Sequence, residues 1–446
     1  MPQERSVVLV QLPFPSQTEP EPALQSYYAI YTRLFRRLVP NYGTTQGDLW
    51  EAPLWVAHLD GALGREDTTF VDLSLCAADS EVCSAELRQR VRSPAYVLFS
   101  PLAQNFDLAV RTAHRLRGNG LITVLGGNMA RLATRGDFDL VFAGHAGADL
   151  YERLECREHG LIGVWPKLGT RQLLRGGRPR YRLLRSFGAR VPLIRLNASH
   201  GCLFGCTFCG DYWSRQLHVV PYDDLQGEFD EIEATFPGIT TVYVGDKTFG
   251  QSREAVENLI RATARRRRPY QFIVQTHVSM VDDWLFDALD RLGAGIVELG
   301  FETADERVLK ELRKRGGVQI YRAAIERLHR HGRAVILNVM GGLPSQTEET
   351  QTTTVQFLRE TAHLVYLYNL YNFVPYPETP LFPVLRPRIV DWDFSHWRED
   401  QPVIFRPYSV TRERAWALFM ELVQECTDLC QRRERSLSPQ DGTLHA

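Results

Sequence analysis

Residues 201–210 read Gly-Cys-Leu-Phe-Gly-Cys-Thr-Phe-Cys-Gly. The cysteines of this stretch follow a CxxxCxxC spacing, and an apolar segment at Leu193–Asn197 comes just before them. Three thiolates on one short loop can ligate three irons of a cubane cluster and leave the fourth iron open. A structural zinc ion needs four protein ligands, and no fourth cysteine or histidine lies nearby at zinc-ribbon spacing. The spacing therefore predicts a [4Fe–4S] cluster on Cys202, Cys206 and Cys209.

A series of alternating strands and helices begins at this cysteine loop. Apolar segments of strand length recur, and the apolar residues between them follow helical spacing. This alternation is typical of a parallel sheet, and six strands are too few for a closed eight-stranded barrel. We therefore predict a partial (β/α)6 barrel over residues 192–390. Its strands are expected at Leu193–Asn197, Thr241–Gly245, Gln271–Thr276, Gly295–Gly300, Ala334–Met340 and Leu367–Phe373. Its helices are expected at Leu225–Ala234, Arg253–Ala264, Asp283–Leu292, Val308–Leu312, Ile320–His331 and Thr347–Thr361.

The first third of the chain shows the same alternation and predicts a separate α/β domain over residues 1–164. We expect a doubly wound parallel sheet whose ligand edge lies at the carboxyl ends of the strands. Residues 165–191 are rich in Arg, Gly and Pro and are predicted to be a linker. Residues 391–446 are predicted to be a helical C-terminal region with a polar tail, its helix spanning Glu413–Arg433. The strands of the first sheet are expected at Ser6–Leu12, Thr69–Leu75, Ala95–Ser100, Leu121–Leu125 and Leu140–Ala143.

The composition limits the partners of the protein. The formal net charge is -1, so no overall field favours nucleic acid or an anionic membrane. No stretch reaches the ~18 apolar residues expected of a membrane span, and the first residues do not have the pattern of a signal peptide. These features predict a cytoplasmic protein with reduced thiols that binds neither nucleic acid nor membrane.

The cysteine loop and its context resemble the radical S-adenosylmethionine (SAM) superfamily. The resemblance covers the predicted barrel, about half of the chain, and implies that a [4Fe–4S] cluster and SAM are the cofactors. It implies that Phe208, the aromatic residue before the third cysteine, contacts the adenine. Four further segments resemble superfamily landmarks in the expected order: Val244–Phe249, Gly300–Thr303 ("GxES"), Ile336–Pro344 ("GLPGET") and Tyr376–Pro380 ("YPGTP"). From these segments the resemblance implies that SAM is bound by Asp246, Glu302 and Asn338.

The predicted N-terminal domain resembles the cobalamin-binding domain that precedes the barrel in one large subgroup of the superfamily. Gly126 and Gly127 after the fourth strand match that domain. The "GEGE" after the fifth strand has become Gly144-His-Ala-Gly147, and no DxHxxG stretch supplies an axial histidine. Cobalamin is therefore a possible third cofactor, and an empty scaffold is the alternative.

Lys247 and His277, at the predicted catalytic rim, are the candidates for catalysis. Only four of the 52 basic residues are lysines (Lys167, Lys247, Lys310 and Lys314), so a lysine at the rim is notable. Lys247 follows the second barrel strand and is a candidate for substrate or SAM-carboxylate binding, or for proton transfer. Gln275 and His277 lie two apart on the third strand and are expected to face the same way, with one of them contacting the substrate.

The resemblance implies a 5′-deoxyadenosyl radical that removes hydrogen from an unactivated carbon of a small molecule, with natural-product (antibiotic) biosynthesis as the expected setting. The reductant is expected to be external, of the flavodoxin or ferredoxin type or a dedicated reductase. The first hypothesis for the outcome is cobalamin-dependent C-methylation. The second is a cobalamin-independent diol dehydratase acting on an aminoglycoside sugar. Methylthiolation is a third class, but it requires a second three-cysteine cluster near the N-terminus, where only Cys76, Cys83 and Cys156 are available.

Overall fold

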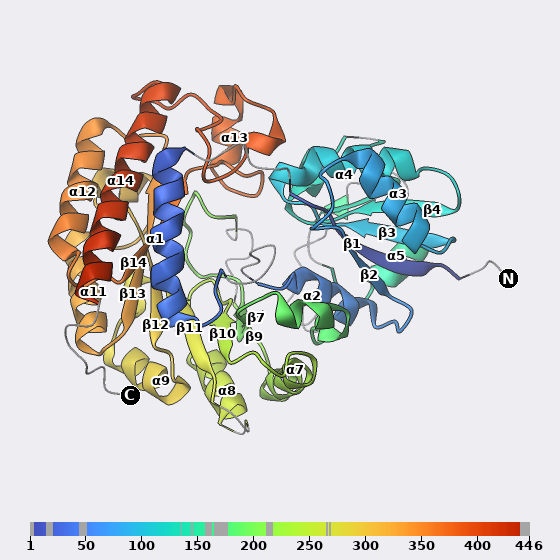
Figure 1. Ribbon diagram of the computed structural model, residues 1–446, viewed down its shortest axis with the longest axis horizontal. Coiled ribbons are helices and arrows are strands. Elements are labelled where there is room, and N and C mark those ends of the chain that lie inside the picture. The colour runs from blue at the N-terminus through green and yellow to red at the C-terminus, as the bar shows by residue number, and fades with distance from the viewer. Residues whose placement is uncertain are drawn as a thin grey trace.

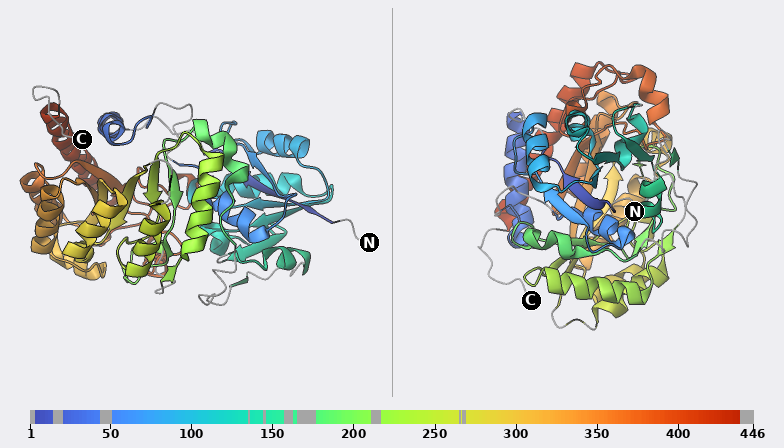
Figure 2. Two further views of the ribbon diagram at one scale, coloured as in Figure 1. Left: turned by 90° about the horizontal axis from the view of Figure 1, so that it is seen from below. Right: turned by 90° about the vertical axis from the view of Figure 1, so that its right-hand side faces the viewer.

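The computed structural model describes residues 4–14, 21–43, 51–134, 136–143, 146–156, 163–164, 177–210, 217–264, 266 and 269–437. They form two large sheets, each made of parallel strands, that lie side by side in the molecule and have helices of their own (Figures 1 and 2). Among these residues no helix is both long enough and apolar enough to cross a membrane.

The first sheet is doubly wound, as predicted. Its strand order is β2-β1-β3-β4-β5-β6, and every pair is parallel. The order reverses between β1 and β3, and in open α/β sheets ligands bind at such a switch point, beyond the carboxyl ends of the strands. The strands are β1 (Ser6–Gln11), β2 (Thr69–Asp72), β3 (Ala95–Phe99), β4 (Leu121–Leu125), β5 (Leu140–Ala143) and β6 (Gly163–Val164). The helices are α2 (Leu54–Leu63), α3 (Ser80–Arg90), α4 (Phe106–Leu116) and α5 (Leu150–Cys156).

The second sheet is the predicted six-stranded partial barrel, ordered β14-β13-β12-β11-β10-β7 and parallel throughout. Most residues of these strands are apolar because both of their faces are covered. The strands are β7 (Ile194–Leu196), β10 (Thr241–Val244), β11 (Gln271–Thr276), β12 (Ile296–Glu302), β13 (Ala334–Gly341) and β14 (Leu367–Asn372). The helices are α7 (Tyr222–Thr235), α8 (Arg253–Thr263), α9 (Asp283–Leu292), α10 (Glu306–Glu311), α11 (Val318–Arg330) and α12 (Glu348–Thr361). A short antiparallel pair, β8 (Ser199–His200) and β9 (His218–Val219), flanks the cysteine loop.

Helix α1 (Pro22–Leu38) departs from the predicted domain partition. It lies in the region assigned to the first domain, yet it packs beside α14 (Arg412–Ser436) and against β14 of the barrel (Figure 1). The hydroxyl of Tyr27 donates to the carbonyl of Tyr368 at 2.7 Å, and Arg33 pairs with Glu434 at 2.8 Å. Apolar and aromatic side chains at helical spacing bury this face of α1 against the barrel.

Two further segments join the parts of the molecule. The 3-10 helix η3 (Tyr181–Ala189) lies within the predicted linker, and the hydroxyl of Tyr181 donates to Glu228 Oε1 at 2.6 Å. After β14 the chain forms α13 (Phe382–Leu385), η6 (Arg386–Arg388) and η7 (Phe394–His396). Residues of this region share a hydrophobic cluster with the first sheet, so the two sheets have one continuous apolar contact. The polar tail after residue 437 lies outside the described residues.

Candidate functional site

The cysteine loop is anchored through a buried carboxylate. Asp246, just beyond β10, accepts hydrogen bonds from the backbone N–H groups of Ala198 at 2.7 Å and Ser199 at 2.9 Å, and from the Ser199 hydroxyl at 2.5 Å. Burial raises the pKa of Asp246 to about 6, and these hydrogen bonds limit the rise. Asp246 therefore holds the chain at the entrance to the cysteine loop, whereas its predicted contact with SAM stays a prediction.

The three cysteines lie on one turn of chain without disulfide bonds. Cys206 is buried, Cys202 and Cys209 are half-buried, and the N–H of Cys209 donates to the carbonyl of Cys206 at 3.3 Å. In the described part of the chain, no three Cys, His, Asp or Glu side chains converge as ligands of a single metal ion. A cubane places each thiolate on a different iron, so its ligands need not converge on one point. The donor set therefore suits a three-cysteine cubane with one open iron.

A buried ion pair lies beside the cysteine loop. Lys314 Nζ is 2.9 Å from Glu302 Oε1, and the two side chains are only 7% and 8% exposed. Burial favours the neutral amine, but the Glu302 carboxylate, with Tyr321 and Cys206, raises the pKa of Lys314 and keeps it charged. The same ammonium lies 6.0 Å from the ring centroid of Phe208. Glu302, Phe208 and Cys206 are thus brought together around one lysine.

Sequence reasoning missed Lys314. Its scarcity was the available signal, because only four lysines occur in the chain. The lysine chosen from the sequence, Lys247, is an exposed residue next to Thr248, whose hydroxyl donates to the Lys247 carbonyl at 2.8 Å. The catalytic role of Lys247 stays a prediction.

The backbone at Glu302 adopts an uncommon conformation. Its φ is 67°, in the left-handed region that non-glycine residues seldom occupy, and the β12–β13 register shifts between Gly300 and Glu302. Such strain costs on the order of 1–3 kcal/mol and persists where the surroundings fix it, often at functional sites. Here it turns the carboxylate toward Lys314.

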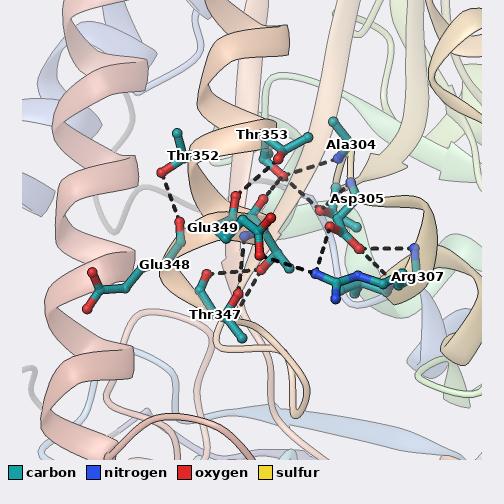
Figure 3. Close-up of polar contacts among 12 residues, drawn as sticks. Ala304, Asp305, Arg307, Thr347, Glu348, Glu349, Thr352 and Thr353 are labelled. Atoms are coloured by element: carbon teal, nitrogen blue, oxygen red, sulfur yellow. Dashed lines mark hydrogen bonds and ion pairs between the residues drawn. The ribbon is translucent and has the colours of Figure 1, made fainter.

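The turn after Glu302 is fixed by polar contacts to the first turns of α12. The hydroxyls of Thr303 and Thr354 are 2.8 Å apart, and the N–H of Ala304 donates to Thr354 Oγ1 at 3.2 Å. Figure 3 shows Ala304 and Asp305 beside the start of α12, with Arg307 directed toward Glu349. This network supplies the surroundings that hold the strained turn.

His277 lies just beyond β11 and is stacked on the ring of Phe204, with centroids 4.1 Å apart. Its Nδ1 accepts from the N–H of Ser279 at 3.1 Å. Burial, and then the Lys314 ammonium, lowers the pKa of His277 to about 3. The ring is therefore neutral across the physiological range, which suits packing and hydrogen bonding and does not suit a histidine that gains and loses a proton near neutral pH.

Asn338 and Gln275 carry polar groups into the barrel. Asn338 on β13 accepts from Asn369 Nδ2 at 2.8 Å. Gln275 Oε1 lies 3.3 Å from the hydroxyl of Tyr243, which donates to Glu298 Oε2 at 2.9 Å. Burial raises the pKa of Glu298 to about 7, and the Tyr243 hydrogen bond and Arg195 limit the rise.

Glu298→Gln should change how stability depends on pH. Because the folded state holds the Glu298 proton up to about pH 7 and an unfolded chain loses it near 4.5, the wild type should lose stability as the pH rises through this interval. The loss should reach roughly 3 kcal/mol, at 1.4 kcal/mol per pKa unit. The variant has no such proton, so the difference between its thermal midpoint and that of the wild type should increase, in favour of the variant, from pH 5 to pH 8. Parallel midpoint curves over that range would show that Glu298 titrates normally.

The predicted cobalamin edge of the first sheet approaches the cysteine loop. Gly127 has a φ of 78°, and a Cβ there would lie 2.7 Å from Ser100 Oγ, whereas a Cβ at Gly126 would meet nothing within 4 Å. Arg131, four residues further on, pairs with Glu378 at 3.1 Å, and Glu378 packs beside Gly210. Glu378 occupies the glycine position of the "YPGTP" landmark. Open space at a glycine turn on the carboxyl edge of the sheet, one strand away from the switch point, suits a bound cofactor.

Comparison with known proteins identifies the barrel. Residues 196–358 match the family model of the radical SAM superfamily. The bacteriochlorophyllide d C-12(1)-methyltransferase of Chlorobaculum tepidum is 24% identical over 246 residues, covering 52% of this chain and 51% of that protein. The hopanoid C-3 methylase of Methylococcus capsulatus is 26% identical over 204 residues, covering 45% and 38%. The chain thus spans about half, or less, of the curated relatives it matches.

Solved structures extend the likeness to both sheets. The methyltransferase TsrM from Kitasatospora setae, solved with tryptophan and a SAM analogue, has a TM-score of 0.60 at 14% identity, over 86% of this chain and 76% of that one. The cobalamin-dependent SAM radical enzyme OxsB, solved with aqua-cobalamin and SAM, has a TM-score of 0.57 at 13% identity, over 99% and 63%. The predicted fold class, a B12-binding-like sheet followed by a radical SAM barrel, is confirmed. The radical SAM domain also confirms a [4Fe–4S] cluster and SAM as cofactors.

Proposed function

We propose that this protein, whose residues 196–358 form a radical SAM domain, is a cobalamin-dependent methyltransferase that methylates an unactivated carbon of a small molecule. The observation that carries the proposal is the placement of the Gly126–Gly127 edge beside the cysteine loop, where Arg131 and Glu378 join the two. A cofactor on that edge would face the barrel. The relatives whose names specify methylation, and the two neighbours of like fold, support the same reading.

The residues of the site have separable roles in this proposal. Cys202, Cys206 and Cys209 would hold the cluster, and Gly126 and Gly127 would leave room for cobalamin. When bound, the cluster supplies the electron for reductive cleavage of SAM, and cobalamin supplies a transferable methyl group. Glu302 and Lys314 present a carboxylate and an ammonium to the polar groups of SAM, with Phe208 beside them. The Phe204–His277 stack keeps water from one side of the loop.

The proposal also requires an electron donor and a suitable compartment. We expect the electron donor to be external, of the flavodoxin or ferredoxin type or a dedicated reductase. A cytoplasmic location would keep the three thiols reduced and able to ligate iron. Natural-product biosynthesis is the setting we propose for the small-molecule substrate.

The test is cobalamin binding by a matched pair of glycine variants. Anaerobically reconstituted wild type should retain hydroxocobalamin through gel filtration, as seen in its absorption spectrum. Gly126→Phe should lose the cobalamin and keep the cluster, because the side chain fills the open edge. Gly238→Phe, at another glycine whose Cβ would meet nothing within 4 Å, should behave as wild type. Failure of the wild type to retain cobalamin, with SAM cleavage intact, would refute the methyltransferase.

One observation favours a second candidate, a cobalamin-independent dehydratase. Glu298 and Tyr243 form a hydrogen-bonded pair inside the barrel, and the Glu298 carboxyl keeps its proton to about pH 7. A protonated carboxyl could donate to a departing hydroxyl, as a general acid does. Turnover that needs no cobalamin and yields 5′-deoxyadenosine without S-adenosylhomocysteine would favour this reaction, on an aminoglycoside sugar or another diol.

A further inference from the structure

The interior of the barrel is polar on each of its six strands. Barrel interiors are usually filled by branched apolar side chains. Here each strand carries at least one polar group at an inward position, whereas Tyr368, which precedes one of these positions on β14, lies near the cysteines of α14 on the outer face. The inward residues, which we term the polar belt, are Arg195, Tyr243, Gln275, Glu298, Asn338, Asn369 and Tyr371.

The belt is a connected network. The Arg195 guanidinium lies over the Tyr243 ring at 4.3 Å, and its Nε is 2.5 Å from Glu51 Oε2. Tyr243 in turn donates to Glu298, whose carboxyl also receives a hydrogen bond from Asn369. Side chains on β7 and β14, the two edge strands of the sheet, are therefore linked through the carboxyl group of Glu298.

Tyr371 shows that solvent reaches part of the polar belt, and we term this accessible part, with the carboxyl groups around it, the chamber. Burial raises the pKa of Tyr371, and the nearby carboxyl groups of Glu298, Glu399 and Glu302 raise it further. Yet Tyr371 is 37% exposed, so solvent reaches a ring that protein surrounds. Glu399, whose Oε1 accepts from the Tyr376 hydroxyl at 2.9 Å, is likewise exposed although burial raises its pKa. Helix α1 covers the β14 side, and its Tyr31 is near Glu298 and Tyr371.

The charges of the chamber are unbalanced. Two of its carboxylates already have a cation: Glu51 pairs with Arg195, and Glu302 pairs with Lys314. Glu298 and Glu399 accept hydrogen bonds from tyrosine hydroxyls and form no ion pair among the described residues. The chamber therefore contains two more carboxyl groups than cations, arranged around an accessible phenol ring.

We propose that the substrate is a hydrophilic small molecule with a protonated amine, bound between Glu298 and Glu399 against the face of Tyr371. An ammonium would gain a charge-assisted hydrogen bond to Glu399 and a cation–π contact with the ring. Its positive charge would favour the ionised form of Glu298, which would release its proton to solvent and bind the ammonium as a carboxylate. The amides of Asn338, Asn369 and Gln275 would bind neutral polar groups of the same molecule. The inference rests on the proposed function only in taking this chamber as the substrate site, and it applies to methylation and dehydration alike.

The test compares two disaccharides of one skeleton that differ in charge. Di-glucosamine, the β-1,4-linked disaccharide of glucosamine, carries an amine at carbon 2 of each ring, where cellobiose carries a hydroxyl, and is otherwise identical to it. Calorimetric titration of the reconstituted, SAM-loaded enzyme should give at least tenfold tighter binding of di-glucosamine. Glu298→Gln and Glu399→Gln should each weaken its binding about tenfold or more, since a charge-assisted hydrogen bond is lost. Glu257→Gln removes a carboxylate that pairs with Arg291 on the outer surface and should change nothing.

Equal or tighter binding of cellobiose, or di-glucosamine binding that neither chamber variant weakens, would overturn the inference. So would the absence of binding by both sugars to enzyme that binds SAM. Cluster content and SAM affinity, measured on the same samples, report on the proposed function independently. An enzyme that selects the amine but retains no cobalamin would support this substrate class and refute the methyltransferase.

Discussion

Cys206→Ala is expected to abolish both the cluster and the formation of 5′-deoxyadenosine. Cys206 is the most buried of the three cysteines and lies at the centre of the loop, next to the Lys314–Glu302 pair. Two remaining thiolates cannot hold a cubane that keeps one iron open for SAM. Iron and sulfide content after anaerobic reconstitution, and 5′-deoxyadenosine measured after reduction with dithionite, check this outcome.

A second buried cysteine provides the control for this substitution. Cys430 on α14 is 1% exposed and far along the chain from the loop. Its loss removes a similar volume from a buried position, so Cys430→Ala should cost some stability and leave the iron content at the wild-type level. If Cys206→Ala cleaved SAM as fast as the wild type does, the assignment of the cluster to these cysteines would be refuted.

Lys314→Met is expected to cost the protein most of its affinity for SAM. The substitution keeps the length and burial of the side chain but leaves the Glu302 carboxylate, 8% exposed, without its cation. Removing one partner of a buried ion pair costs about 3–5 kcal/mol. If half of that penalty falls on SAM binding, the Kd rises roughly tenfold to a hundredfold. Equilibrium dialysis with labelled SAM, on protein of verified iron content, measures the change.

The matched control is Lys310→Met, on the same short segment but exposed to solvent. It should leave SAM affinity unchanged, and Lys314→Arg should restore part of it because the cation is kept. Unchanged SAM affinity in Lys314→Met would mean that the ion pair serves only to hold the loop between α10 and α11.

Most of the fold could be predicted because its strands are apolar runs of strand length. The predicted barrel strands overlap all six that form, since each is buried on both faces and its pattern is local. Helix α1 could not be placed in the same way. Its aromatic face indicates that it is buried, but nothing in a helical period says which of two sheets will cover it.

The same distinction, between local sequence pattern and contacts made only on folding, separates the site residues that could be predicted from those that could not. The cysteines could be predicted because their ligand spacing lies within eight residues of one loop. Lys314 could not, because its burial and its partner, Glu302, twelve residues earlier, arise only from the turn between α10 and α11. Asp246 could be identified from its landmark position. In the structure, however, its carboxylate accepts hydrogen bonds from the backbone N–H groups of Ala198 and Ser199, and no residue pattern specifies these contacts.

The most direct test of the central claim, a SAM-binding cluster on three cysteines, is Mössbauer spectroscopy of the wild type reconstituted with 57Fe. We expect the spectrum of a [4Fe–4S] cluster in which SAM changes the signal of one iron and leaves the other three as they were. A cubane spectrum that SAM does not alter, or iron that forms no cubane on this loop, would contradict it.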